Sequence, residues 1–189
     1  MWMSTQKTLL TADEFYDFCC QNEGRYELER GIIVEKDGPA KPKTRTALNI
    51  ASAMFLFVHH NSLGRVRVET GYYIETNPDS QRDPDVTFLT AARVSGEDNG
   101  TLTYPAPPDI AVQIASTSSV TAEMERKVNE YLAAGAQRVW LVYTATAATP
   151  RGVIIHRPDG VTATYTGDDV ITDEELLPGF SLPLSEIFE

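Results

Sequence analysis

Two short apolar segments, each entered through a Pro-Asp pair, constrain this chain more than any other feature of its sequence. The pairs are Pro84-Asp85, ahead of Val-Thr-Phe-Leu-Thr, and Pro108-Asp109, ahead of Ile-Ala-Val-Gln-Ile-Ala. Both segments predict buried β-strands. Proline cannot donate a hydrogen bond within a sheet, so it marks a strand start and leaves the following carboxylate at the sheet rim. Such a pair is an ordinary turn signal, although rim carboxylates also build binding and catalytic sites.

The region after the second Pro-Asp pair predicts a strand–helix–strand unit. Residues 109–115 and 138–143 are apolar strands, and residues 118–134 carry an apolar helical face that closes at Gly135. Two strands joined by such a crossover run parallel, whereas the rest of the chain consists largely of hairpins. The order of elements predicts an α/β fold with a mixed central sheet, formed by residues 1–189 as a single domain.

The remaining segments predict shorter elements. Thr11 and Glu14 have the spacing of a capping box, which starts a helix that runs to about Cys20. The nearly continuous apolar run 47–59 predicts a largely buried helix that follows a polar loop at residues 41–43. The other expected elements are two strands within 25–35 with a turn at 30–31, a strand at 65–75, a loop at 95–108, a hairpin of 152–156 with 161–165, and a docking segment at 177–188.

Charge and cysteine content restrict the setting in which the chain works. The formal net charge is −11, which argues against binding nucleic acid through bulk electrostatics, although a bound cation or a local basic patch can offset it over a small cleft. The two cysteines, Cys19 and Cys20, are adjacent, which favours a reducing, cytoplasmic setting. No apolar run reaches the roughly 18–20 residues of a membrane span, and the first residues lack a signal-peptide pattern.

Three further polar residues occupy positions that require an explanation. Gln113 shares a strand face with two alanines, and a buried amide must find partners because leaving it unsatisfied costs ~1–3 kcal/mol. Lys127 borders the apolar stripe of its helix and can present its ammonium at the sheet rim, or form an ordinary helical ion pair with Glu123. Glu27 lies on the first predicted strand, where a carboxylate is either solvated or functional.

Several segments, taken together, resemble a large bacterial family of restriction-endonuclease-like proteins within the PD-(D/E)XK nuclease superfamily. They cover nearly the whole chain in the family's order, and the full set is specific where no single motif is. The matching segments are Arg25-Tyr-Glu-Leu-Glu-Arg-Gly-Ile, Arg82-Asp-Pro-Asp-Val-Thr-Phe-Leu, Pro108-Asp-Ile-Ala-Val-Gln-Ile-Ala-Ser-Thr-Ser-Ser, Lys127 with Tyr131-Leu-Ala-Ala-Gly-Ala, Val139-Trp-Leu-Val and Leu177-Pro-Gly-Phe.

The resemblance implies a restriction-endonuclease-like mixed sheet flanked by helices, with a Mg²⁺ site at one edge. Asp85 matches the metal-binding aspartate, Glu27 an acidic residue of the first strand, and Lys127 the lysine that this family carries on the following helix. The family usually has Glu where this chain has Gln113. The implied catalytic set is therefore Glu27, Asp85, Gln113 and Lys127, with Mg²⁺ held by the first three.

The function implied by the resemblance is Mg²⁺-dependent hydrolysis of DNA phosphodiesters by a homodimer. Replacing Glu by Gln at position 113 keeps a carbonyl ligand but removes one negative charge, and the histidine that the family often has near Thr44 or Arg45 is missing. These departures leave a second interpretation, a catalytically inactive member that binds nucleic acid or protein. A third, an interaction module without nuclease chemistry, agrees with the net charge of −11.

Overall fold

The fold combines two larger sheets, one smaller sheet and five helices within the part of the chain that the structure describes. It is a computed structural model, and it describes residues 9–36, 38, 41–94, 103–115, 121–144 and 150–189. In chain order the elements are α1 (Ala12–Gln21), β1 (Tyr26–Glu29), β2 (Ile32–Glu35), α2 (Lys41–His60), β3 (Gly64–Val68), β4 (Gly71–Glu75), β5 (Ser80–Arg82), β6 (Val86–Thr90), α3 (Ala91–Val94), β7 (Thr103–Tyr104), β8 (Ile110–Ala115), α4 (Thr121–Ala134), β9 (Arg138–Tyr143), β10 (Gly152–His156), β11 (Thr162–Tyr165), β12 (Val170–Asp173), β13 (Leu177–Pro183) and α5 (Leu184–Phe188).

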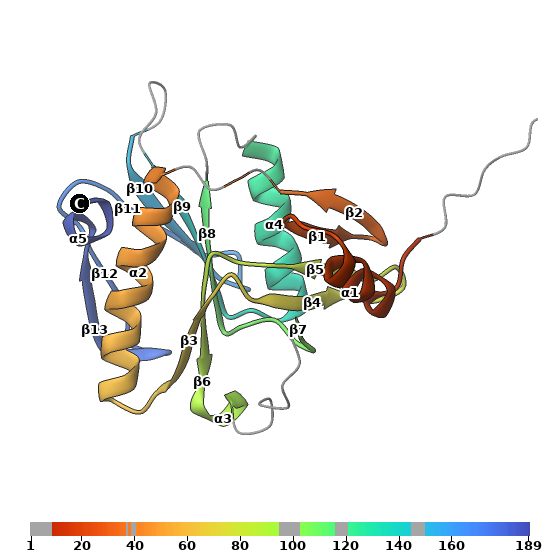
Figure 1. Cartoon of the computed structure of the whole chain (residues 1–189). Coiled ribbons are helices and arrows are strands. Elements are labelled where there is room, and N and C mark those ends of the chain that lie inside the picture. Colours follow the sequence, from red (N-terminus) through yellow and green to blue (C-terminus); the bar gives the residue numbers. More distant parts are fainter. Residues whose placement is uncertain (1–8, 37, 39–40, 95–102, 116–120, 145–149) are drawn as a thin grey trace, which may run out of the picture.

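The central sheet is mixed, as the order of elements predicts. Its strands follow the order β11-β10-β9-β8-β6-β3, with β8 and β9 parallel and the other neighbours antiparallel. The parallel pair is joined by α4, which confirms the expected crossover unit. Figure 1 shows α2 and α4 on opposite sides of this sheet.

The alternation of side chains along β8 explains why a helix covers each face of the central sheet. Ile110, Val112 and Ile114 belong to the core cluster that includes the buried side of α2. Ala111 and Ala115 face the other way and pack in the cluster of α4. Small side chains on the α4 face leave room for larger polar groups beside them, which is where the candidate site lies.

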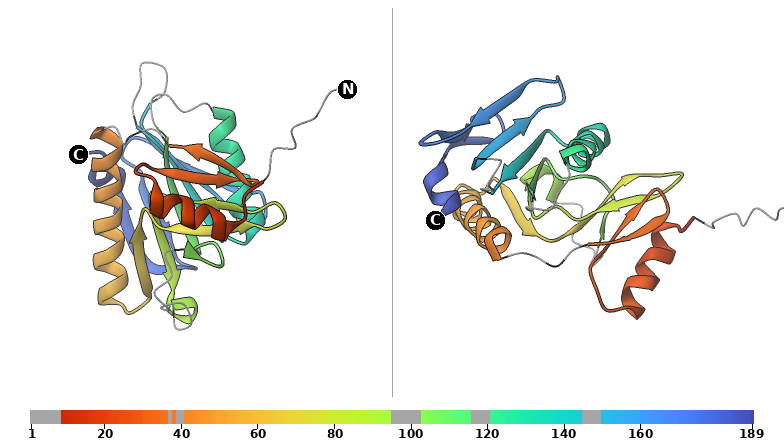
Figure 2. Two further views of the ribbon diagram at one scale, coloured as in Figure 1. Left: turned by 45° about the vertical axis from the view of Figure 1, so that its right-hand side comes forward. Right: turned by 90° about the horizontal axis from the view of Figure 1, so that it is seen from above.

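A long, bent hairpin links the central sheet to the five-stranded sheet, whose order is β2-β1-β5-β4-β7. Strands β3 and β6 pair in the central sheet, and their continuations β4 and β5 pair in the other. The bend lies at Glu69 on one arm and Asp85 on the other, and the Glu69 N–H donates to the Asp85 carbonyl at 3.4 Å. Figure 2 shows the five-stranded sheet and α1 projecting to one side of the central sheet. The expected single strand at 65–75 is therefore wrong, because Glu69 adopts a positive φ of 46° that ends β3.

Helix α2 differs most from the expectation. It begins at Lys41 rather than near residue 47, because the proline at position 42 is compatible with a first helical turn. It is also only half buried: Leu48, Phe55 and Leu56 are 63%, 52% and 68% exposed. The apolar run therefore does not mark an all-buried helix, since only Thr46, Ile50, Met54 and Val58 are buried.

The other local expectations fare better. The capping box of α1, the turn between β1 and β2, the end of α4 at Gly135 and the β10–β11 hairpin are all present. The segment 177–188 forms β13 and α5, and β12 was not expected. The expected loop 95–108 contains β7, while residues 95–102 and the expected helix start at 118–120 lie outside the described part of the chain. No helix in the described ranges has the length and apolar character to cross a membrane.

The start of β3 gives a stability prediction. A Cβ at Gly64 would lie 1.9 Å from the Leu89 carbonyl oxygen, and the φ of +153° is unfavourable for any other residue. We expect Gly64→Ala to lower the free energy of unfolding by about 1–3 kcal/mol in urea denaturation. Gly38→Ala is the control, because nothing lies within 4 Å of its Cβ position. Equal stability of the two variants would contradict this account of β3.

Candidate functional site

Asp85 lies on the bend between the two sheets, directly before β6. Its backbone N–H donates to the Val112 carbonyl at 3.0 Å, which fixes the bend against β8. Its Oδ2 accepts from the Ile114 N–H at 2.7 Å and from Gln113 Nε2 at 3.3 Å. Its Oδ1 forms an ion pair with Lys43 Nζ at 2.9 Å, and only 1% of the residue is exposed. Asp85 and Gln113, which the sequence put on neighbouring strands, are therefore brought into contact.

Gln113 has one oxygen that the surrounding side chains leave without a partner. Its Nε2 is used by Asp85, but its buried Oε1 accepts no hydrogen bond in the described structure. A buried acceptor without a donor is unfavourable by ~1–3 kcal/mol. The oxygen can therefore accept a cation or a donor that the described residues do not supply, while the amide nitrogen of the same side chain contacts Asp85.

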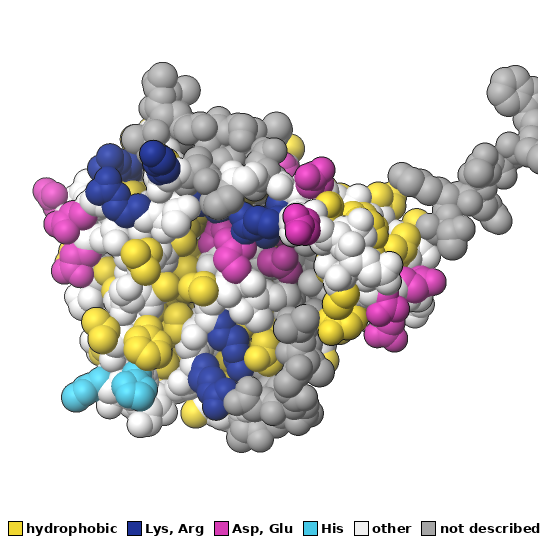
Figure 3. Space-filling view, viewed as in Figure 1, with side chains coloured by type: hydrophobic (Ala, Val, Ile, Leu, Met, Phe, Trp, Pro, Cys, Tyr) yellow, Lys and Arg dark blue, Asp and Glu magenta, His cyan; other side chains and the backbone are white. Residues whose placement is uncertain are grey.

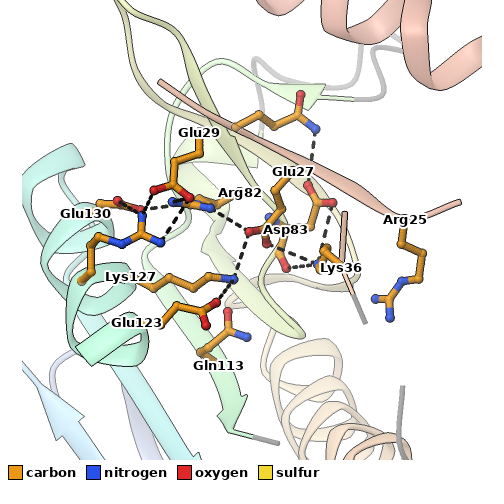
Figure 4. Close-up of polar contacts among 12 residues, drawn as sticks. Arg25, Glu27, Glu29, Lys36, Arg82, Asp83, Gln113, Glu123, Lys127 and Glu130 are labelled. Atoms are coloured by element: carbon orange, nitrogen blue, oxygen red, sulfur yellow. Dashed lines mark hydrogen bonds and ion pairs between the residues drawn. The ribbon is translucent and has the colours of Figure 1, made fainter. Parts of the chain in front are cut away.

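Glu27 forms the centre of a second cluster next to the first (Figure 4). Its Oε2 accepts from Arg82 Nη1 and from Lys127 Nζ, each at 2.9 Å, and its Oε1 lies 3.3 Å from Lys36 Nζ. The Asp83 N–H also donates to Oε1, at 3.4 Å. Burial by itself would raise the pKa of Glu27, but the three cations outweigh it and lower that pKa to about 2.

Arg82 extends the cluster toward α4. Its Nε donates to Glu130 Oε2 at 2.9 Å, and its Nη2 lies 3.4 Å from Glu29 Oε2. Arg126 lies one helical turn before Glu130 on α4. It forms ion pairs with the same two carboxylates, those of Glu29 and Glu130. Burial opposes the charged guanidinium of Arg82, but Glu130 and Glu27 raise its pKa further. The ion pair between Arg82 and Glu130 thereby links the end of strand β5 to helix α4.

Tyr131 is buried on α4, one helical turn beyond Lys127. Its hydroxyl is buried and makes no hydrogen bond to any described group. Burial raises the pKa of Tyr131 well above its ordinary value, and the negative charges of Glu27, Asp83 and Asp85 act in the same direction. The charges of both clusters therefore affect the pKa of Tyr131, and its hydroxyl stays protonated, as a hydrogen-bond donor, near neutral pH.

The structure places the four expected site residues in two contacting pairs. Asp85 contacts Gln113, and Glu27 contacts Lys127, all four being buried. Figure 4 shows the Gln113 side chain pointing toward the Lys127 ammonium, which also lies 3.9 Å from Glu123. The sequence led us to expect that Glu27 binds the metal directly, whereas both of its carboxylate oxygens contact cationic side chains in the structure.

Sequence reasoning missed the cations that complete the site, namely Lys36, Lys43 and Arg82. One signal pointed to Arg82: Glu27 and Glu29 are two residues apart, share a face of β1 and need a cation between them. Lys43 had no such signal, because it depends on the early start of α2. Arg45 and Thr44, at the position of the missing histidine, are exposed on the same turn.

The donor set fits a weakly held Mg²⁺ ion rather than a complete protein cage. No three carboxylate, histidine or cysteine side chains converge on one point among the described residues. Asp85 Oδ1 and the unpartnered Gln113 Oε1 are hard oxygen donors, and the two side chains touch through their other polar atoms, Oδ2 and Nε2. Mg²⁺ commonly takes one or two protein oxygens and completes its shell with water and phosphate. The Lys43 ammonium contacts Asp85 Oδ1, so a metal ion would compete with this lysine for the carboxylate.

Comparisons with known proteins agree with this fold. A family model named Uma2, with the description "Putative restriction endonuclease", matches residues 12–185. Five solved chains match, among them the crystal structure of a putative nuclease from Anabaena variabilis with 19% identity and a TM-score of 0.78. The alignment covers 95% of this chain and 97% of that one, and at this identity it shows the shared fold. A search of curated proteins gives no significant match.

The lowered pKa of Glu27 predicts a specific loss of stability in acid. The folded pKa is about 2 and the ordinary value is 4.5, so the unfolded state binds more protons between these pH values. The stabilisation is complete above about pH 4.5 and is lost as the pH falls toward 2. We expect the difference in unfolding free energy between the parent and Glu27→Gln to be about 3 kcal/mol at neutral pH and to shrink from pH 5 to pH 3 in urea titrations.

The control for this measurement is Glu35→Gln, which removes the same charge from an exposed position on β2. A difference between parent and Glu27→Gln that stays constant across this pH range would contradict the assignment of Glu27 as an ionised carboxylate in the folded protein.

Proposed function

The chain belongs to the Uma2 family, described as "Putative restriction endonuclease", and from this membership we propose that it is a Mg²⁺-dependent DNA endonuclease of the PD-(D/E)XK type. The observation that carries the proposal is the contact between Asp85 and Gln113, which leaves one acceptor oxygen of the amide without a partner. Lys127, on α4, points toward the Gln113 side chain of this pair (Figure 4). The three groups supply oxygen ligands and a cation at one edge of the central sheet.

Each side chain has a distinct role in the proposed hydrolysis. Asp85 and Gln113 would hold the metal, which polarises the scissile phosphate and lowers the pKa of an attacking water. Lys127, held in place by its ion pair with Glu27, would stabilise the negative charge that develops on the phosphate oxygens. Glu27 acts through Lys127 and is therefore a positioning residue. Tyr131 can donate its hydroxyl to the same region.

Further parts of the proposal concern assembly. Cutting both strands of a duplex requires two sites, so we propose that the active form is a homodimer. We also propose that it acts in the cytoplasm, in keeping with its two exposed, unbridged cysteines.

A second candidate function is a catalytically inactive member that binds nucleic acid or a protein. It is favoured by one observation: the site has a single carboxylate beside Gln113, and the Lys43 ammonium already occupies one oxygen of that carboxylate. A site of this kind binds a divalent cation weakly unless a phosphate contributes ligands. The two candidates predict different outcomes for the same cleavage experiment.

We expect purified protein to nick supercoiled plasmid in the presence of Mg²⁺ or Mn²⁺. Asp85→Asn and Lys127→Met should each reduce the rate by about a hundredfold or more, because each removes a charge that acts on the transition state. Asp159→Asn, in the exposed β10–β11 turn, makes the same chemical change away from the site and should cut like the parent. Absence of nicking by the parent would favour the inactive member, and nicking by Asp85→Asn would place the chemistry elsewhere.

The role of Gln113 has its own test. Gln113→Glu restores a second carboxylate next to Asp85, so it should lower the Mg²⁺ concentration for half-maximal nicking by about tenfold or create cleavage in an inactive parent. Calorimetric titration with Mg²⁺ measures the same change without relying on cleavage. If neither the metal affinity nor the rate responds, the metal does not bind at Gln113.

A further inference from the structure

A basic hollow lies at the N-terminal end of α2, apart from the residues that form the candidate site. It has a volume of about 290 Å³. Lys41 and Arg45 from the first turns of α2 and Arg151 from just before β10 contribute its cations. The other lining residues are Pro42, Thr46, Thr144, Phe188 and Glu189.

The cations of this hollow outnumber its carboxylates, since Glu189 is the one acidic side chain among its described lining residues. Lys41, Arg45 and Arg151 are exposed, and none of them forms an ion pair with a carboxylate among the described residues. The Arg151 guanidinium donates to the Phe188 carbonyl at 3.3 Å and lies 5.8 Å from the centre of the Phe188 ring, which holds it in place. The first turn of α2 contains no acidic residue to offset the partial positive charge of the helix N-terminus. The hollow therefore suits an anion.

We propose that this hollow binds a backbone phosphate of the nucleic acid whose scissile phosphate lies at Asp85. The inference rests on the proposed function and adds to it a second anchoring point for the substrate strand. Arginine and lysine contacts to phosphates fix the position and register of a nucleic acid without reading its sequence. The anchor would thus orient the strand and leave base recognition to other residues.

The arrangement of residues along α2 relates the hollow to the site. Lys41 and Arg45 are four residues apart and line the hollow together, whereas Lys43 lies between them on the opposite side of the helix and reaches Asp85 at 2.9 Å. An α-helix with its side chains is about 10–12 Å across. The hollow and Asp85 are therefore separated by a distance on the order of a few nucleotides of a duplex, which rises about 3.4 Å per base pair along its axis.

The central sheet also places the hollow close to the candidate site. Thr144, which lines the hollow, directly follows β9, and its hydroxyl donates to the Ala115 carbonyl at 3.5 Å. Ala115 ends β8, the strand that carries Gln113. The hollow thus lies near the end of the strand that carries Gln113, and a nucleic acid lying over the N-terminal half of α2 would pass both.

The distribution of charge on this face accounts for how an acidic protein can bind nucleic acid. Figure 3 shows Lys and Arg side chains gathered at the upper end of α2 and at the centre of the same face, while Asp and Glu side chains lie largely toward its two sides and between these groups. The net charge of −11 is an average over the whole chain. A local row of cations near the site offsets that average where a phosphate backbone would lie.

The test is fluorescence anisotropy of a labelled 20-base-pair DNA duplex, with all proteins carrying Asp85→Asn so that the probe remains uncut. The hollow variant is Lys41→Gln with Arg45→Gln. The control is Arg30→Gln with Arg157→Gln, which also removes two positive charges, one from the β1–β2 turn, where Arg30 lies 3.9 Å from Glu75, and one from the residue after β10. Arg151→Gln tests the hollow from a different element, and thermal melting checks that each variant folds.

We expect the hollow variant to raise the Kd about tenfold near 0.1 M salt and to make the slope of log K against log salt shallower by about 0.9, the loss of one phosphate contact. Arg151→Gln should shift Kd in the same direction, and the control should stay within about twofold of the parent. An equal change in the hollow variant and the control, or no change in either, overturns the anchor while leaving the nuclease proposal intact. If the parent itself binds no DNA in any salt, both proposals fall.

Discussion

The buried carboxylate of Glu27 is the interaction on which the rest of the site depends. It gathers three cations from three places in the chain: Lys36 after β2, Arg82 at the end of β5 and Lys127 on α4. Removing one partner from such a buried ion pair typically destabilises a protein by 3–5 kcal/mol, because the remaining charge is left uncompensated. Glu27 therefore fixes the five-stranded sheet against α4, and α4 in turn packs on the central sheet.

The same arrangement explains why the lysine of this site can come from a helix. Lys127 is held at 2.9 Å from Glu27 and points toward Gln113, so a helix residue brings its ammonium to the polar side chain of β8. Arg82 and Glu130 brace α4 on the other side. The helix is thus held rigidly enough to place one long, flexible side chain, which normally has considerable rotamer freedom.

Sequence reasoning predicted the family, the mixed sheet and the parallel β8–β9 unit, because apolar patterns and turn signals are local properties of the chain. It also brought Asp85 and Gln113 to neighbouring strands. It did not predict the bend at Glu69, which is held by the distant Asp85, and it overlooked the early start of α2, which Pro42 permits. It therefore missed Lys43, which reaches Asp85 from the first turn of α2, and it also missed Lys36, whose partners Glu27 and Asp83 lie on other strands and turns.

The separation of Glu27 from its partners also bears on how the chain folds. The bent hairpin pairs residues that are close in sequence, whereas the hydrogen bond between Lys127 and Glu27 joins residues 100 positions apart. Closing so long a loop has an entropic cost that is recovered only after the elements at both ends have formed. The cluster around Glu27 should therefore assemble late in folding, so partly folded chains contain the sheets but not the complete site.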